Sequence, residues 1–260
     1  MIKETKIDSL QVKIYQDRIE MGANAAALVA DKIRSLLFQK ENVNVIFAAA
    51  PSQNEFLQFL CEEREVEWNR VNVFHMDEYI GLDRSAEQSF GNFLRNKIFD
   101  KIPFCSINYI DGNADNLLDE CKRYSDLLEL YPADIVCMGI GENTHIAFND
   151  PHLADFNDMQ LVKVADLDEA CRQQQVNDGC FATLNEVPLF AITLTIPALL
   201  RARNIYCMVP GGNKAQAVYY TLKEKISEDY PSTIIRKHHN SIMFLDRDSS
   251  KKIIDEIPLS

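Results

Sequence analysis

The segment NVNVIFAAAP at residues 42–51 decides the fold class. It is short, apolar and rich in β-branched residues, and a proline ends it. Strands of this composition are typical of parallel sheets covered on both faces, because neither face then needs polar side chains. We therefore expect a fully buried strand here.

Amphipathic helices flank this strand, and the alternation continues along the chain. Before it, apolar residues recur at helical spacing from Asp17 to Gln39. After it, we expect helices at 52–64, 85–99, 114–130, 197–203 and 213–226, and strands at 71–76, 107–110, 133–140, 189–196, 205–211 and 241–246. Strands joined by helices form right-handed crossovers. The predicted fold is therefore α/β: a doubly wound, mostly parallel, Rossmann-like sheet with helices on both faces, in a single domain over residues 1–260.

The composition excludes several classes of protein. With 47% hydrophobic and 25% charged residues, the chain is typical of globular proteins, and no apolar run is long enough to span a bilayer. The formal net charge of −12 repels a polyphosphate backbone, so we expect no nucleic-acid partner and no membrane contact. Seven cysteines lie singly, without a C-x-x-C pair. They predict reduced, structural thiols and no metal site. Because the start of the chain lacks the apolar core of a signal peptide, we expect a cytoplasmic location.

Ligands of doubly wound sheets bind beyond the carboxyl ends of the strands, so the residues that follow each strand are candidates for a site. Ser52 and Glu55 form an S-x-x-E capping box, which places Ser52 at a helix N-terminus suited to phosphate, although most such boxes only cap a helix. Lys214 falls in the first turn of a later helix, where the helix dipole disfavours a cation unless an anion binds there. A solvated surface lysine is the alternative.

Acidic residues and a histidine follow two other strands. Asp77 and Glu78 are adjacent, so only one of them can point into a given cleft, and a turn with solvated acids is the alternative. In GIGENTHIAFND, residues 139–150, two glycines allow a tight bend, while Asn143, His145 and Asp150 supply an amide, an imidazole and a carboxylate. A histidine beside a carboxylate can transfer protons near neutral pH, although a lone histidine is more often structural.

Three motifs in order, FHMDEYIGL (74–82), GIGENTHIAFND (139–150) and PGGNKAQA (210–217), carry a family resemblance. Together they resemble the glucosamine-6-phosphate deaminase family of hexosamine-6-phosphate deaminases and isomerases over nearly the whole chain. The related 6-phosphogluconolactonases share the fold, but typically carry an arginine where Tyr79 stands and H-x-A-S-L-F-P in place of HIAFNDP. The resemblance therefore favours the deaminase and isomerase branch.

The resemblance implies conversion of glucosamine 6-phosphate and water into fructose 6-phosphate and ammonia, without metal or organic cofactor. His145 matches the residue that opens the sugar ring, and Asp77 matches the base that moves a proton from C2 to C1. By the same matching, five residues are expected to bind the substrate or its phosphate: Ser52, Gln53, Gly141, Lys214 and, in the 166–181 segment, Arg172.

Two departures indicate a divergent member. Relatives usually place an aspartate and a glutamate around the histidine, where this chain has Asn143 and Asp150, so the imidazolium should be less stabilised. The segments RQQQVNDGCF and ITLTIPALL resemble members assigned to galactosamine 6-phosphate. The residues therefore leave open the sugar epimer, a non-catalytic sugar-phosphate sensor and a lactone hydrolase. A homo-oligomer also stays open, because family members range from monomers to hexamers.

Overall fold

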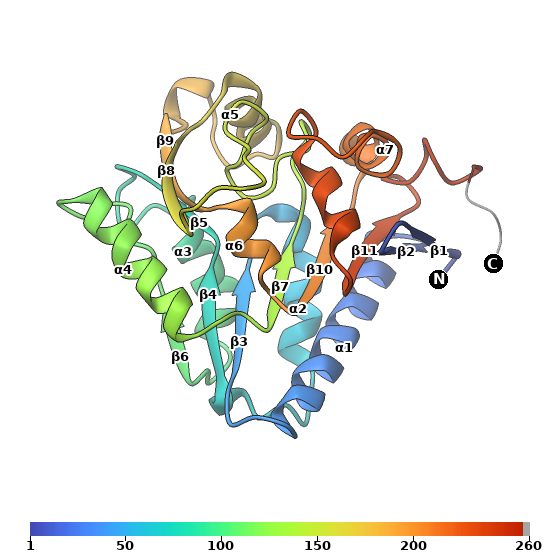
Figure 1. Ribbon diagram of the computed structural model, residues 1–260, viewed down its shortest axis with the longest axis horizontal. Coiled ribbons are helices and arrows are strands. Elements are labelled where there is room, and N and C mark those ends of the chain that lie inside the picture. The colour runs from blue at the N-terminus through green and yellow to red at the C-terminus, as the bar shows by residue number, and fades with distance from the viewer. Residues whose placement is uncertain (257–260) are drawn as a thin grey trace.

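The computed structural model describes residues 1–256, so the last four residues of the predicted domain, 257–260, lie outside it. An eight-stranded sheet runs through the molecule in the order β1-β2-β11-β10-β7-β3-β4-β6 (Figure 1). All neighbouring strands are parallel except the hairpin β1–β2. The strands are β1 (Lys3–Ile7), β2 (Leu10–Tyr15), β3 (Val43–Phe47), β4 (Val71–His75), β6 (Ser106–Asn108), β7 (Ile135–Met138), β10 (Asn204–Val209) and β11 (Ser241–Asp246).

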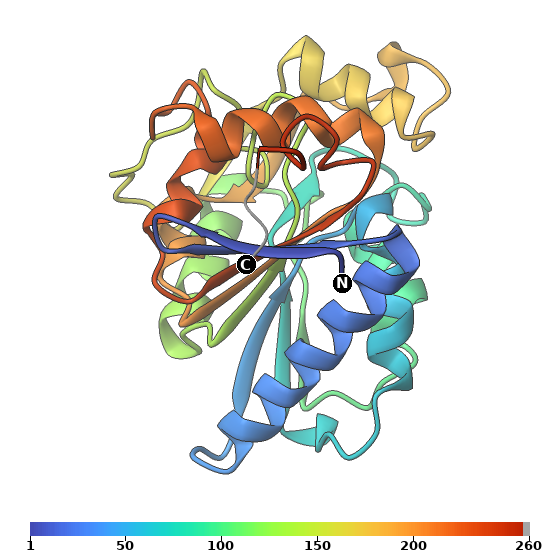
Figure 2. The ribbon, with the colours of Figure 1, turned by 90° about the vertical axis from the view of Figure 1, so that its right-hand side faces the viewer.

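Helices cover both faces of this sheet. In β3, Val45 and Phe47 belong to one hydrophobic core and Ile46 belongs to the other, so the strand is buried on both sides, as its composition predicts. Figure 2 views the sheet from its hairpin edge, with α1 and α2 on one side and α4 on the other. The first core packs under α1 (Arg18–Leu37), α2 (Asn54–Glu62) and α3 (Phe90–Leu94), and the second under α4 (Leu117–Leu130), α6 (Ile196–Leu200) and α7 (Ala215–Lys223). The predicted doubly wound, mostly parallel α/β fold is confirmed.

A second sheet corrects part of the prediction. It has three antiparallel strands in the order β5-β9-β8, with bounds Asp77–Tyr79, Phe190–Leu194 and Val162–Asp166. The predicted strand at 189–196 therefore exists, but it pairs outside the main sheet. The short strand β5 was not predicted, because three residues show no periodicity. Figure 1 shows this sheet beyond the carboxyl ends of the main strands, beside α5 (Glu169–Asn177).

The hairpin β1–β2 and helix α5 were also not predicted. Strand β1 has no fully buried residue, and the buried residues of α5 are Cys171, Gln174 and Gln175. Neither β1 nor α5 shows the apolar stripe from which a strand or helix is recognised, whereas the alternating Leu10, Val12 and Ile14 of β2 were an available signal that the prediction missed. No helix among residues 1–256 is long and apolar enough to cross a membrane.

Close packing of α1 against α2 generates a prediction about stability. A Cβ atom at Gly22 would lie 2.7 Å from Cβ of Glu55 and 2.9 Å from the backbone nitrogen of Phe56. Gly22→Ala should therefore lower the free energy of unfolding by about 1–3 kcal/mol, because the two helices must separate. Urea unfolding measures this change. Asn24→Ala, on the exposed side of α1, is the control, and equal stability of both variants would contradict the prediction.

Candidate active site

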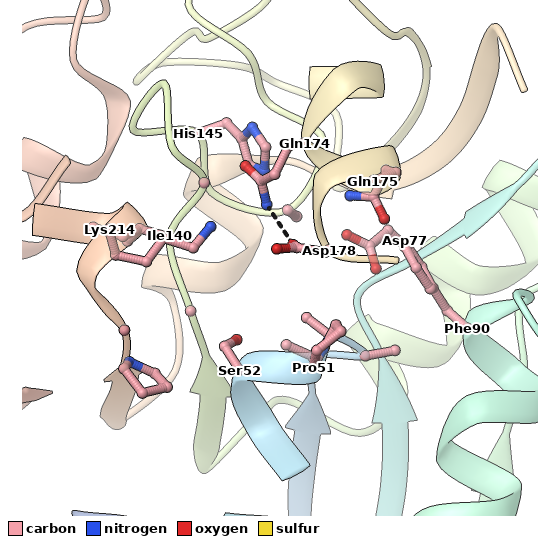
Figure 3. Close-up of a pocket in the computed structure, with 18 of the residues that line it drawn as sticks. Pro51, Ser52, Asp77, Phe90, Ile140, His145, Gln174, Gln175, Asp178 and Lys214 are labelled. Atoms are coloured by element: carbon pink, nitrogen blue, oxygen red, sulfur yellow. Dashed lines mark hydrogen bonds between the residues drawn. The ribbon is translucent and has the colours of Figure 1, made fainter. Parts of the chain in front are cut away.

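A cleft opens where the carboxyl ends of β3, β4, β7 and β10 meet α5 (Figure 3). The structure brings to it five of the residues that the sequence singled out, from segments spread over more than half of the chain. They are Ser52, Asp77, Gly141, His145 and Lys214.

Asp77 enters the cleft from strand β5, which is held on both sides. It pairs with Thr193 of β9, and its backbone carbonyl lies 2.8 Å from Nδ1 of His75. Nε2 of His75 accepts the N–H of Ile110 at 2.9 Å, so the proton of this neutral ring is on Nδ1 and is donated to Asp77. Burial lowers the pKa of His75 to about 4, which keeps the ring neutral. His75 thus fixes the backbone of Asp77.

The two adjacent acids point to opposite sides of β5, as predicted. Only 6% of Asp77 is exposed, and burial, with the neighbouring charge of Glu78, raises the pKa of Asp77 well above its usual range. The Glu78 carboxylate instead accepts the backbone N–H groups of Tyr79, Phe90 and Gly91 at the start of α3. Asp77 is therefore the acid in the cleft, and Glu78 stabilises a helix N-terminus.

His145 lies on the loop that follows β7. A Cβ atom at Gly141 would approach the imidazole to 2.3 Å, so only glycine lets the ring occupy this place. Thr144 and Ala147 have positive φ angles of 72° and 50°, which mark the tight turns on either side of the histidine. The ring is 8% exposed and lines the cleft. The loop therefore fixes the imidazole at the cleft wall.

Asp150 and Asn143 lie behind the imidazole and do not line the cleft. Nδ1 of His145 is 2.9 Å from Oδ1 of Asp150, and Nδ2 of Asn143 donates to the same oxygen at 2.9 Å. Burial raises the pKa of Asp150, but the contacts with His145 and Asn143 outweigh it and lower the pKa. Asp150 is thus held as an anion, which favours a proton on Nδ1 and leaves Nε2 as the proton acceptor.

Lys214 is the buried cation of the cleft. It is 4% exposed, and it follows a turn in which Gly211 has a φ angle of 96°. Burial lowers the pKa of the ammonium group, and the carboxylates of Asp178 and Glu142 partly oppose this effect. A buried ammonium group whose charge is only partly balanced by nearby carboxylates is suited to bind an anion.

The capping box predicted at Ser52 is wrong. Ser52 belongs to the 3-10 turn Pro51–Gln53, and α2 begins at Asn54 without a side-chain cap. The carboxylate of Glu55 instead pairs with the guanidinium of Arg18, with Nε and Oε1 2.7 Å apart. Ser52 still lines the cleft, where its hydroxyl accepts from Nε2 of Gln53 at 3.1 Å.

Two predicted ligand residues do not line the cleft. Gln53 is 1% exposed, and its amide lies 3.4 Å from the carbonyls of both Met138 and Met208, so it joins the ends of β7 and β10 beneath the cleft. Arg172 donates to the carbonyls of Leu184 and Val187. It therefore ties α5 to the following segment and is not placed as a phosphate ligand.

Other polar residues that the sequence prediction missed do line the cleft. Gln174 and Gln175 come from α5, Asp178 directly follows the end of that helix, and Arg18 comes from the start of α1. Nε2 of Gln174 lies 3.4 Å from a carboxylate oxygen of Asp178, and Figure 3 shows this carboxylate pointing into the cleft. Polar residues three and four positions apart, Gln175 and Gln174 before Asp178, were the available signal, because that spacing places side chains on one helix face.

Comparison with known proteins extends these observations. A family model described as glucosamine-6-phosphate isomerases/6-phosphogluconolactonase matches residues 16–244. A glucosamine-6-phosphate deaminase of Bacillus cereus (strain G9842) is 32% identical over 253 residues, covering 95% of this chain and 91% of the relative. Another, of Bacillus thuringiensis (strain Al Hakam), is 33% identical over 230 residues, covering 86% of this chain and 85% of the relative.

Solved structures agree with this match. A protein described as a monomeric glucosamine-6-phosphate deaminase has a TM-score of 0.84 at 28% identity, covering 92% of this chain and 98% of that chain. A 6-phosphogluconolactonase of Thermotoga maritima has a TM-score of 0.73 at 20% identity, covering 90% of this chain and 98% of that one. The latter likeness shows the fold alone.

At its carboxyl edge the doubly wound sheet carries a cleft lined by a carboxyl group, an imidazole and a buried ammonium group, an arrangement typical of α/β enzymes. The family model covers most of the chain, and the curated relatives exceed 30% identity. The chain belongs to the family of glucosamine-6-phosphate isomerases and 6-phosphogluconolactonases, which confirms the resemblance found in its motifs.

Burial of Asp77 generates a prediction about stability and pH. Its pKa is raised in the folded state, so its contribution to stability is full below the unfolded pKa of about 4 and is lost as the pH rises toward the folded value. Asp77→Asn cannot ionise. It should therefore exceed the parent in free energy of unfolding at pH 8 and match it near pH 4.

Urea unfolding across this pH range measures the difference. Asp115→Asn, in an exposed loop, is the control and should show no such gain. A parent that is as stable as Asp77→Asn at pH 8 would mean that the Asp77 carboxylate is not penalised by burial.

Proposed function

We propose that the protein is a hexosamine-6-phosphate deaminase and isomerase. The substrate is glucosamine 6-phosphate, or its galactosamine epimer, and the products are the corresponding ketose 6-phosphate and ammonia. The observation that carries this proposal is that Asp77, His145 and Lys214 line one cleft. An acid–base pair and an anion-binding cation are what the isomerisation of a phosphorylated sugar requires.

Each step has a group of this chain to perform it. Lys214 and Ser52 hold the phosphate, with Gly141 keeping the wall open for the ring of His145. Nε2 of His145 takes the proton of the anomeric hydroxyl and returns one to the ring oxygen, which opens the sugar. Asp77 then moves the C2 proton to C1, which leaves an imine at C2. Water adds to that imine, and ammonia leaves.

The amide at position 143 favours a catalyst over a sensor. Asn143 donates to Asp150 at 2.9 Å and so helps to keep that carboxylate ionised beside the imidazole. The histidine therefore retains a charged partner although a second carboxylate is missing. Asn143 and Asp150 act on the imidazole in this proposal and do not touch the sugar.

Lactone hydrolysis has weaker support. The 6-phosphogluconolactonase structures share only the fold at 20% identity or less. Tyr79, where those enzymes typically carry an arginine, is 1% exposed and packs against Phe90, Phe148 and Phe181. A cytoplasmic location belongs to the proposal and is supported by the free thiols of all seven cysteines.

Ammonia release from the purified protein tests the proposal. Glucosamine 6-phosphate or galactosamine 6-phosphate should yield ammonia and a ketose phosphate, and Asp77→Asn and His145→Gln should each lower kcat by about 10²–10⁴-fold, because each removes one positioned acid–base group. Asp115→Asn serves again as the matched control. Binding of both sugar phosphates without any release of ammonia would contradict the proposed deaminase activity and favour a non-catalytic sugar-phosphate sensor.

Asp178 generates a separate prediction about affinity. Its carboxylate acts on Lys214 in the same cleft and opposes the approach of a phosphate dianion. Asp178→Asn should lower KM for the sugar phosphate by about 3- to 10-fold, the effect of about 1 kcal/mol of charge repulsion, with kcat little changed. Steady-state kinetics measure it. Asn177→Ala, one residue away and exposed, is the control, and a raised KM would show that Asp178 binds the substrate.

A further inference from the structure

Three side chains of different chemistry converge behind His145. One ring nitrogen of His145, one carboxylate oxygen of Asp150 and the sulfur of Cys171 all lie within 4.8 Å of one another. The three residues are 8%, 0% and 1% exposed. Cys171 comes from α5 and the other two come from the loop after β7, so the cluster joins the covering helix to the catalytic loop.

Two buried polar atoms of this cluster lack a hydrogen-bond partner. Among residues 1–256, Nδ1 of His145 and Oδ2 of Asp150 make no hydrogen bond. Oδ1 of Asp150 lies 2.9 Å from Nδ1 as an ion-pair contact. Buried polar atoms are normally satisfied, so two neighbouring exceptions facing a thiol indicate room for a ligand that accepts electron pairs.

The chemistry of the donors selects the ligand. Nitrogen, oxygen and sulfur donors together suit Zn²⁺, whereas the sulfur disfavours Mg²⁺ and Ca²⁺. Zinc bonds of roughly 2.0 Å to nitrogen and oxygen and 2.3 Å to sulfur place tetrahedral ligand atoms roughly 3.3–3.8 Å apart. The observed separations, 2.9 Å for the His145–Asp150 pair and at most 4.8 Å for those with sulfur, need shifts of only about 1 Å.

We propose that His145, Asp150 and Cys171 form a zinc site that inhibits the enzyme. The inhibitory role rests on the proposed function, whereas zinc binding itself does not. Zinc replaces the proton on Nδ1 of His145 and the proton of the Cys171 thiol, and both protons pass to solvent. The open fourth position takes a water molecule.

Inhibition follows from the tautomer of the imidazole. Without metal, the Asp150 carboxylate favours the proton on Nδ1, and Nε2 can accept a proton from the sugar. With zinc on Nδ1, the neutral ring carries its proton on Nε2 and can only donate. Ring opening then loses its proton acceptor, although Asp77 and Lys214 are unchanged.

Calorimetry with Zn²⁺ alone on chelator-treated protein tests the site. The parent should bind one equivalent, and Cys171→Ala should lower the affinity by about 100-fold or more, because even residues that only orient a metal ligand cost up to that much. Cys180→Ser, a cysteine of the same segment outside the cluster, is the control and should bind as the parent does. Absent binding, or equal binding by Cys171→Ala, overturns the proposal.

Two further measurements keep the test independent of folding and of the reaction. Co²⁺ in place of Zn²⁺ should give the parent a sulfur-to-cobalt charge-transfer band. This measurement needs only the parent, so it tests the site even if Cys171→Ala fails to fold. A parent without the band contradicts the site. Ammonia release should fall with zinc in the parent and in Cys180→Ser. Ammonia release that saturating zinc leaves unchanged overturns the inhibitory role, whereas zinc binding without any ammonia release refutes only the proposed function.

Discussion

One buried residue, Thr193 of β9, holds the two halves of the catalytic cleft in register. It pairs with Asp77 of β5, and its hydroxyl accepts the N–H of Phe148 on the loop that carries His145. In the next turn of that loop, Asn149 donates to the carbonyl of Leu194. Because Thr193 and Asn149 are fully buried, these bonds do not compete with water. The separation of the acid from the imidazole thus depends on a strand far from both in sequence.

The cleft brings together buried ionisable groups, which are unfavourable in a protein interior. A carboxyl group with a raised pKa, a buried ammonium group with a lowered one, and a second carboxylate on α5 meet in one space. Burial of such groups costs stability, and pKa values shifted in this way are typical of functional sites. In a chain of net charge −12, the buried Lys214 places a positive charge inside this cleft.

The groups that hold the imidazole of His145 contact it from the side that faces away from the cleft. The imidazole rests on Gly141, and Asp150 reaches it together with the amide of Asn143. The amide holds the carboxylate by a hydrogen bond and adds no second negative charge beside the ring. The thiol of Cys171 completes a set of donors beside the same ring and makes the ring a point at which a metal ion can act.

The sequence by itself determined the layered α/β fold and the positions of the main chemical groups. Buried strands and amphipathic helices are recognised from the spacing of apolar residues along the chain. Motifs at the strand ends predicted that Asp77, His145, Lys214 and Ser52 would lie at one edge of the sheet. Gln53 and Arg172 were expected there too, but their side chains face the backbone of neighbouring segments.

Only the tertiary structure decided which strands pair and which helix face meets the cleft. Strand β5 has three residues, and its partner β9 follows more than a hundred positions later, so no local pattern records their pairing. Helix α5 turns glutamines and Asp178 toward the cleft, so it lacks an apolar stripe by which it could be predicted. The physical reason is that local propensity depends on neighbours in the chain, whereas the geometry of this site depends on contacts between distant segments.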